Sequence, residues 1–335
     1  MPRNRPPRIL VLPMADEQHG SSRLRAWQYL PYLERAGFEV RAVNRVALPS
    51  DLGYGAAVVR GILWSDLVLL QKRFLPGWLL RLCRTLGKKV VYDFDDAIYA
   101  LRDGTPAPRV NDLHACLRLS AALVAGNECL ASYARAHNTR VAVIPTPVAA
   151  LSFTPKPRTP GRFVVGWIGS RGALPDLRLL YGVLQRLPKL VPEMVLKVIS
   201  AEPVSIEGVR VENVRWQLAT ADDELRQADI GIMPLPDNVY GQGKCAYKAL
   251  QCMSLGLPVV LSPVGMNREI VTNGVEGFWA NSDDEWIDAV GRLHKDPELA
   301  AGMAGAAHAR AQAYTLERCA EKLLMLFRGV LEYRR

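Results

Sequence analysis

The stretch GIMPLPDNVYGQGKCAYKALQCMSLGLPVVLSPVGMN, residues 231–267, decides the fold of this chain. It opens on an apolar strand, passes through a loop rich in Pro, Asp, Asn and Gly, and enters a helix from about Lys244. Gly256 followed by Pro258 is a strong helix stop, and residues 258–261 then form a second apolar run. The stretch therefore predicts a βαβ unit with a polar first turn.

Two lysines stand out in this predicted helix. Lys244, Lys248 and Gln251 fall at i, i+4 and i+7 and so share one helix face. A helix dipole disfavours a cation in the first turns by roughly 0.3–1 kcal/mol. The lysines therefore suit a site that binds an anion at this end, and a solvated basic helix face is the alternative interpretation.

The same alternation of strand and helix extends outward in both directions. Apolar strands are predicted on both sides of a proline-rich segment, residues 145–160, whose composition is typical of a domain linker. We expect an α/β chain of two doubly wound, Rossmann-like domains that face each other across a cleft. The predicted strands are residues 8–15, 38–43, 66–70, 89–92 and 141–144, then 163–167, 195–200, 209–214, 230–233 and 259–261. Long helices are predicted at residues 285–314 and 315–332.

Composition is ordinary for a soluble globular protein, with 49% hydrophobic and 22% charged residues among 335. No apolar run approaches the roughly 18 residues of a membrane span. The basic start and short apolar run resemble a signal peptide, but the run ends at Asp16 and Glu17 without a cleavage-like site, which favours a first strand. The six cysteines lack metal-ligand spacing, so we expect reduced thiols in a cytoplasmic protein.

Positive charge is concentrated in the first half of the chain. Residues 1–160 hold 22 Lys and Arg against 12 Asp and Glu, whereas residues 161–335 hold 20 against 21. Two surfaces with different partners are therefore expected, and the absence of nucleic-acid-binding motifs argues against nucleic acid as one of them. Residues 74–89 add a basic amphipathic helix, with Trp78, Leu79, Leu82 and Leu86 opposite four basic residues. Such a helix can lie on an anionic membrane or simply pack on the sheet.

The strand at residues 89–92 runs into Asp93, Asp95 and Asp96. Three interpretations remain open: a divalent-metal motif, the first motif of a haloacid-dehalogenase-like phosphatase, or carboxylates at a strand end that bind or deprotonate a hydroxyl. A further polar turn, with Gly20 and Ser21, follows the first predicted strand and can offer N–H groups to an anion.

Several segments, taken in order, resemble family-4 glycosyltransferases of the GT-B fold, the glycosyl transferases group 1. The likeness lies in residues 20–40, 92–96, 125–134, 143–148, 167–170, 221–238, 243–253 and 262–271, and so spans nearly the whole chain. The resemblance implies an N-terminal acceptor domain (residues 1–155), a C-terminal nucleotide-sugar domain (156–313) and a last helix (314–335) that crosses back to the first.

The resemblance also implies roles for individual residues. Asp95, Asp96 and Lys244 are expected to be catalytic, with Lys244 stabilising the departing nucleoside diphosphate. Residues expected at the donor diphosphate and sugar are Gly20, Ser21, Gly169, Ser170, Arg171, Lys244, Lys248, Met266 and Asn267. Residues expected at the nucleoside are Trp216, Pro234, Leu235 and Gln251, although a structural tryptophan and a surface loop would account for the first three equally well.

Two departures from the family pattern concern the same block. Many members carry two glutamates eight positions apart, which here align with Gly243 and Gln251. A glutamine can still hydrogen-bond ribose hydroxyls, whereas glycine cannot replace a contact to the donor sugar. In the first half, Asp95 occupies the place of a histidine that often precedes Asp96 in the family.

The expected activity is hexosyl transfer from a UDP- or GDP-sugar to a glycan or lipid-linked acceptor, metal-independent and retaining by resemblance. No cofactor is expected, and the role would be synthesis of a bacterial surface polysaccharide, lipopolysaccharide or glycolipid. The basic half would meet an anionic acceptor or the inner face of the plasma membrane, as a cytoplasmic, peripheral protein. The alternative is a catalytically inactive, sugar-nucleotide-binding partner subunit, which the missing glutamates suggest.

Overall fold

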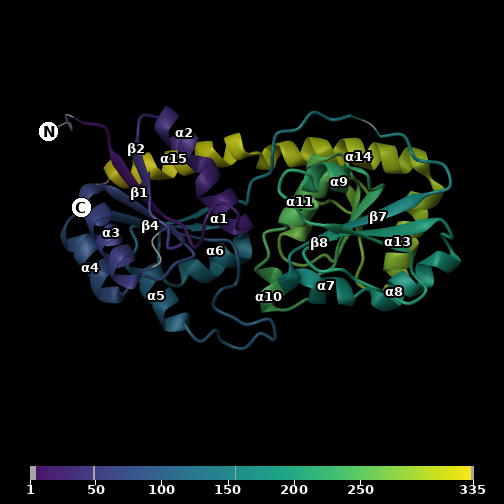
Figure 1. Ribbon diagram of the computed structural model, residues 1–335, viewed down its shortest axis with the longest axis horizontal. Helices are drawn as coiled ribbons and strands as arrows, with labels where there is room; N and C mark the ends of the chain where they lie inside the picture. Colours follow the sequence, from purple (N-terminus) through teal and green to yellow (C-terminus); the bar gives the residue numbers. More distant parts are fainter. Residues whose placement is uncertain (1–4, 48–49, 155, 333–335) are drawn as a thin grey trace. The chain divides into compact units, whose positions relative to one another are not determined.

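The computed structural model describes residues 5–47, 50–154 and 156–332, which form two compact units. The first unit runs to Pro147 and also includes Gly243–Cys245 and the chain from Leu316 onward. The second unit consists of Val148–Gln242 and Ala246–Thr315. Each unit is a doubly wound parallel sheet with helices on both faces (Figure 1), so the predicted α/β architecture is confirmed.

The first sheet has the strand order β2-β1-β3-β4-β5-β6, with every pairing parallel. Its central strands are continuous apolar runs buried on both faces, as parallel sheets require. The strands are β1 (Arg8–Leu12), β2 (Glu39–Ala42), β3 (Leu67–Gln71), β4 (Lys89–Phe94), β5 (Ala122–Ala125) and β6 (Val141–Val143). The helices are α1 (Gly20–Arg25), α2 (Leu30–Arg35), α3 (Asp51–Trp64), α4 (Gly77–Thr85), α5 (Val110–Leu119), α6 (Glu128–Arg135) and α15 (Leu316–Glu332), with a short 3-10 turn at Trp27–Tyr29.

Helix α15 completes the core of the first unit although it comes last in the chain. Its apolar face, including Leu323 and Phe327, packs with Tyr29 and Leu33 against the sheet. Burying a Leu or Phe side chain stabilises by about 1.5–3 kcal/mol. The first unit therefore depends on the end of the chain.

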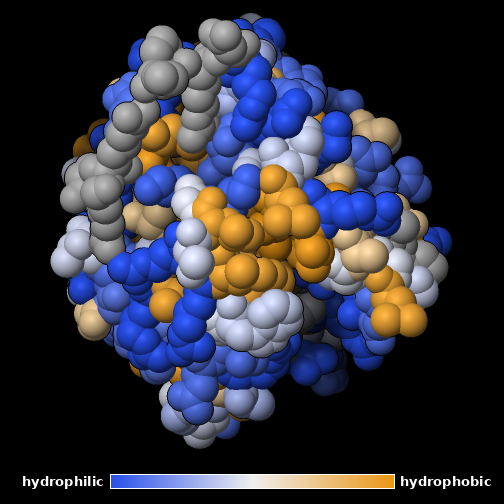
Figure 2. Space-filling view, turned by 90° about the vertical axis from the view of Figure 1, so that its left-hand side faces the viewer, coloured by the Kyte–Doolittle hydropathy of each residue, from blue (hydrophilic) through white to orange (hydrophobic). Residues whose placement is uncertain are grey.

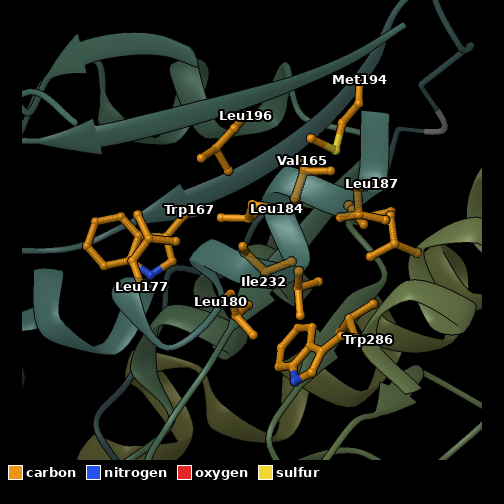
Figure 3. Close-up of a cluster of buried hydrophobic side chains, with 14 of the residues drawn as sticks. Val165, Trp167, Leu177, Leu180, Leu184, Leu187, Met194, Leu196, Ile232 and Trp286 are labelled. Carbon is orange, nitrogen blue, oxygen red and sulfur yellow. The ribbon is translucent and has the colours of Figure 1, made fainter. Parts of the chain in front are cut away.

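The second sheet has the order β12-β11-β10-β7-β8-β9, again parallel throughout. Trp167 and Trp286 lie with aliphatic side chains in its core, between the sheet and α7, α8 and α13 (Figure 3). The strands are β7 (Phe163–Ile168), β8 (Met194–Ser200), β9 (Val211–Arg215), β10 (Ile230–Met233), β11 (Val259–Leu261) and β12 (Gly277–Trp279). The helices are α7 (Leu174–Arg178), α8 (Tyr181–Arg186), α9 (Ala221–Arg226), α10 (Val239–Gln242), α11 (Tyr247–Ser254), α12 (Asn267–Ile270), α13 (Asp283–Lys295) and α14 (Pro297–Ala311), with 3-10 turns at Arg171–Ala173, Leu187–Lys189 and Gln312–Tyr314.

The structure corrects two predicted helices. Helix α11 begins at Tyr247 and not at about Lys244, because Ala246 adopts a left-handed conformation with φ 50°. Lys244 therefore precedes the helix and does not share its face with Lys248. The helix predicted at residues 285–314 is two helices, because Asp296 accepts a hydrogen bond from the Leu299 N–H and caps a new helix, α14.

Candidate functional site

A cluster of charged side chains lies at the carboxyl ends of β3 and β4 in the first unit. Lys72 Nζ, just past β3, lies 3.0 Å from Asp95 Oδ1 and 2.6 Å from Asp96 Oδ2. The Ser21 hydroxyl donates to both Asp95 oxygens at 2.9 and 3.0 Å. Lys244 Nζ lies 2.8 Å from Asp96 Oδ1. The structure thus brings together four residues that were predicted from the sequence to belong to the site. Asp95, Asp96 and Lys244 were expected to be catalytic, and Ser21 was expected at the donor.

Lys72 is the member of this cluster that the sequence analysis missed. Its ammonium is nearly buried, with 8% of the side chain exposed, and its backbone is left-handed with φ 50°, which is uncommon for a residue other than glycine. Burial opposes the charge, but Asp95 and Asp96 outweigh it and raise the pKa of Lys72 above its ordinary value. The available signal was a lysine directly after a buried strand beside the strand that ends in the three aspartates.

The same pairing keeps Asp96 ionised. Burial raises the pKa of its carboxyl, but the opposite effect of Lys72 and Lys244 is larger. The pKa of Asp96 is therefore lowered to about 2. A carboxylate with so low a pKa is a weak base at neutral pH. It is suited to accept hydrogen bonds or to orient a cation.

A glutamine fixes the turn that carries Ser21. The Gln71 side chain, at the end of β3, donates to Ser21 Oγ at 3.0 Å and accepts from the Met14 N–H at 2.9 Å and the Ser22 hydroxyl at 3.1 Å. Gln71 is fully buried. Gly20 and Ser21 lie in the first turn of helix α1, and not in a loop, and hydrogen bonds to the end of β3 hold this helical turn in place.

Asp93 belongs to a different, structural pair. Both its oxygens accept hydrogen bonds from Arg25, including Nε to Oδ2 at 2.9 Å, and both side chains are almost completely buried. Arg25 also donates to the Ile144 carbonyl at 2.9 Å. This arrangement occupies the carboxylate that a phosphatase would use as its nucleophile. Across the described residues no group of three or more His, Cys, Asp or Glu side chains is arranged to hold a metal ion.

Gly243 lies where no side chain fits. A Cβ at this position would lie 2.5 Å from Ala97 Cβ and 2.8 Å from its backbone nitrogen. Next to it, Cys245 Sγ contacts the Asp95 carbonyl at 3.1 Å, and the Asn127 amide donates to the Lys244 carbonyl at 3.0 Å. Close packing in the first unit therefore accounts for glycine at one of the two positions where the resemblance leads us to expect glutamate.

In the second unit, three predicted donor residues follow β7. Gly169 directly follows the strand, and the Trp167 ring would meet a Cβ placed at Gly169. Ser170 and Arg171 are exposed, and Arg171 Nε lies 2.9 Å from Glu202 Oε1. β7 lies between β10 and β8, and such a reversal of strand order is where doubly wound sheets bind ligands. The Gly169 turn is therefore a candidate ligand loop.

Lys248 lies in the first turn of α11 and contacts the β7 side of the sheet. Its Nζ is 5.0 Å from the centre of the Trp167 ring and 3.8 Å from Asp176 Oδ2. Asp176 is almost completely buried, whereas about a fifth of the Lys248 side chain is exposed. The lysine is thus held near β7, with its side chain partly exposed.

Gln251 donates from Nε2 to Asp222 Oδ1 at 2.7 Å and is nearly buried. A glutamate here would face the Asp222 carboxylate, and like charges in contact are destabilising. Position 251 is the second of the two positions where the resemblance implies glutamate, and the hydrogen bond to Asp222 favours glutamine there.

The remaining predicted residues are spread over the loops after β9, β10 and β11. After β10, Pro234 and Leu235 are both buried, and the Leu235 N–H donates to the Ser262 hydroxyl at 3.0 Å. Trp216, which follows β9, is half-buried. Met266 and Asn267 are also buried. Asn267 donates to the Ser262 carbonyl at 2.8 Å, and its Oδ1 has no hydrogen-bond partner among the described residues.

A pocket of about 390 Å³ lies elsewhere on the second unit, around β12 and the start of α13. None of the predicted site residues lines it, and Asp284, Glu285 and Asp288 would repel a phosphate. Its position does not favour it as the donor site.

Comparison with known proteins connects this geometry to one class of enzyme. Residues 174–296, within the second unit, match the family described as glycosyl transferases group 1. A D-inositol 3-phosphate glycosyltransferase of Corynebacterium urealyticum is 26% identical over 187 residues, which are 50% of this chain and 43% of that protein. The match therefore spans less than half the length of this relative.

Several solved structures are similar in fold to this chain over nearly its whole length. The Anabaena protein Alr3699/HepE, in complex with UDP and glucose, has a TM-score of 0.69 at 15% identity over 96% of this chain and 99% of its own. Sucrose-phosphate synthase of Thermosynechococcus elongatus has a TM-score of 0.74 at 15% identity, over 97% and 99%. A glycosyltransferase of Rickettsia africae has a TM-score of 0.72 at 14% identity, over 99% and 100%. The fold is that of GT-B glycosyltransferases, as predicted.

Proposed function

We propose that this chain is a glycosyltransferase that moves a sugar from a nucleoside-diphosphate sugar to an acceptor hydroxyl. The observation that carries the proposal is the match of residues 174–296 to the glycosyl transferases group 1, within the unit that holds the Gly169 turn and α11. In this reaction the bond from the anomeric carbon to the phosphate oxygen breaks and a bond to the acceptor oxygen forms. The hydroxyl proton leaves with the diphosphate or to solvent.

The second unit is proposed to bind the donor. Gly169, Ser170 and Arg171 supply N–H and guanidinium donors to the phosphates, and Lys248 adds an ammonium close to β7. A charge-assisted hydrogen bond contributes about 1.5–3 kcal/mol. The nucleoside is assigned to the loops that carry Trp216, Pro234, Leu235 and Gln251, and the donor sugar to Met266 and Asn267.

The first unit is proposed to bind the acceptor. Asp95 and Asp96, oriented by Ser21 and Lys72, accept hydrogen bonds from acceptor hydroxyls. Lys244, whose ammonium pairs with Asp96, is assigned to the departing diphosphate. The low pKa of Asp96 supports an orienting role for this carboxylate, because it is a poor proton acceptor at neutral pH.

The finer assignment is membership of family 4, with retention of anomeric configuration, no metal ion or other cofactor, and UDP or GDP as the carrier. UDP is favoured because the Anabaena structures were solved with UDP, UDP-glucose and glucose. A glycan or lipid-linked acceptor of a bacterial surface polysaccharide or glycolipid fits this assignment. No described helix has the length and apolar character needed to cross a membrane, and a place at the inner face of the plasma membrane is part of the proposal.

Donor hydrolysis tests the proposal. Purified protein incubated with UDP- and GDP-sugars should slowly release nucleoside diphosphate, with the same rate in chelator. Lys244→Ala should reduce the rate about 100-fold, the loss expected for one preorganised electrostatic contact, while Lys189→Ala, an exposed lysine of the second unit, should not.

Two other outcomes would each reject part of this assignment. Donor binding without hydrolysis or transfer to any acceptor would favour the inactive partner subunit, which the absence of glutamate at Gly243 and Gln251 motivates. Loss of hydrolysis in chelator would contradict metal independence.

A further inference from the structure

Helix α3 carries an apolar stripe on its solvent side. Leu52, Ala56, Val59 and Leu63 fall at i, i+4, i+7 and i+11, and all four are exposed, Leu52 at 89% and Leu63 at 56%. The opposite side of the helix, with Val58 and Ile62, is buried on the sheet. The helix is therefore apolar on both sides, which burial in the first unit alone does not explain.

Helix α4 has the same character. Trp78, Leu79, Leu82 and Leu86 are predicted from the sequence to share one apolar side, and the structure divides this set. Leu79, with its neighbours, packs inward, whereas Trp78, Leu82 and Leu86 are exposed at 62%, 41% and 44%. The alternative that this side simply packs on the sheet is therefore wrong for three of the four residues.

The two stripes form one surface, which we call the α3–α4 face. Lys88, which follows α4, donates from Nζ to the carbonyls of Leu63 at 2.8 Å and Ser65 at 2.6 Å and so ties the ends of the two helices together. Figure 1 shows α3 and α4 next to each other in the first unit. Figure 2 shows a large hydrophobic area on that side, bordered by hydrophilic residues.

The border of the α3–α4 face is basic. Arg60, Arg81 and Arg84 are exposed on the two helices themselves. Exposed leucines and a tryptophan beside these arginines are complementary to a bilayer with anionic headgroups, where the apolar side chains enter the interface and the cations meet phosphates. A soluble acidic partner would not require so much exposed aliphatic surface.

We propose that the α3–α4 face docks the protein onto an anionic lipid bilayer. Leu52, Val59 and Leu63 of α3, Trp78 and Leu82 of α4, and Leu86 directly after α4 enter the interface, and Arg60, Arg81 and Arg84 contact lipid phosphates. The inference gives the membrane partner of the proposed function a specific surface. It rests on these two helices and not on the chemistry of sugar transfer.

Flotation with vesicles tests the proposal. The full chain should float with vesicles of phosphatidylglycerol and phosphatidylcholine in equal amounts, and should remain in solution with phosphatidylcholine alone. Each cation near an anionic surface contributes about 1 kcal/mol, or about fivefold in binding. Arg81→Gln combined with Arg84→Gln should therefore weaken partitioning about 25-fold, and Arg178→Gln, an exposed arginine on α7, should leave it unchanged.

The apolar contribution needs its own variants. Leu63→Ser and Leu82→Ser should each abolish most flotation, while Leu218→Ser, at a similarly exposed leucine of the second unit, should not. These side chains are exposed, so the variants should fold, which circular dichroism checks. Vesicles should also shift the tryptophan emission of the parent to shorter wavelength, and Trp78→Phe should lose most of that shift.

Three results would overturn the proposal. The first is flotation that does not depend on lipid charge, and the second is flotation that is unchanged in both leucine variants. The third is a dimer in light scattering that becomes a monomer in Leu63→Ser. The last would identify a second copy of the chain as the occupant. Donor hydrolysis measured without vesicles separates this inference from the proposed function, because the surface variants should hydrolyse at the parental rate whether or not they bind lipid.

Discussion

Lys72 decides the charge state of the cluster in the first unit, because it is the nearly buried cation shared by Asp95 and Asp96. Lys72→Met would remove the ammonium that pairs with the Asp95 and Asp96 carboxylates. Breaking a buried pair from one side costs about 3–5 kcal/mol, so the free energy of unfolding from urea titration at pH 7 should fall by about 3 kcal/mol. Lys189→Met, at an exposed position, should change it little.

The pH dependence of this loss has a definite sign. The folded-state pKa of Asp96 is depressed to about 2, so the stability that it contributes is present above its unfolded pKa, about 3.9, and is lost as pH falls through 2. The pKa of Lys72 is raised, so its contribution is present below about 10.4 and is lost at more alkaline pH. The gap between parent and Lys72→Met should be widest from about pH 4 to 10 and should narrow in acid. A gap that widens toward pH 2 would contradict the ion-pair account.

Gln251 is the residue at which the glutamate expected from the resemblance can be introduced and its cost in stability measured. Gln251→Glu would place a carboxylate against Asp222 and replace a donated hydrogen bond with repulsion. We expect the free energy of unfolding at pH 7 to fall by about 1–3 kcal/mol, the cost of an unsatisfied buried polar group.

Repulsion would raise the folded-state pKa of this carboxyl pair above its unfolded value. The variant should therefore approach parental stability below about pH 4 and lose it as pH rises. Adding Asp222→Asn should restore the hydrogen bond and most of the stability at pH 7. If the double variant is no better than the single one, contact with Asp222 is not the reason for glutamine at this position.

At the scale of the element, the start of α11 is set by one backbone conformation. Ala246 is buried and left-handed, at a cost of roughly 1–2 kcal/mol for a residue with a Cβ. Ala246→Gly should therefore raise the free energy of unfolding by up to about 1 kcal/mol, after the entropy of glycine is subtracted. Ala249→Gly, three residues later within α11, should lower it by about 1 kcal/mol. If the two variants change the free energy of unfolding in urea in opposite directions, the left-handed cap is confirmed. If both variants lower it by the same amount, the left-handed cap is contradicted.

This conformation also shows where sequence patterns stop being informative. The apolar periodicity of residues 246–253 correctly predicts a helix on the sheet, but periodicity does not register a single positive φ at an alanine. The helix was therefore extended back to Lys244. Strands β5, of four residues, and β12, of three residues, were also missed. Their places are fixed by pairing with β4 and β11.

At the scale of the whole molecule, strand order explains which site residues the sequence could place. Parallel strands end at one edge, so Asp95, Asp96 and Ser21 were expected at the carboxyl edge of the first sheet, and Gly169 at that of the second. Lys72 was missed because its selection depends on β3 and β4 being neighbours, which is a property of the sheet and not of either strand. Ala97 could not be anticipated either, because its contact with Gly243 joins residues that are far apart in the chain.

The division into two units makes the proposed location of the donor testable in the intact protein. If the donor binds the second unit, UDP at 100 times its dissociation constant should stabilise that unit by about 2.7 kcal/mol. Hydrogen exchange should then slow in the turn after β7 and in the first turn of α11, and remain unchanged in the central strands β1, β3 and β4 of the first unit. Lys248→Ala should remove this protection at the same UDP concentration, whereas Lys189→Ala should keep it. Protection confined to the strands of the first unit would instead place the nucleotide there, and the roles proposed for the two sheets would have to be exchanged.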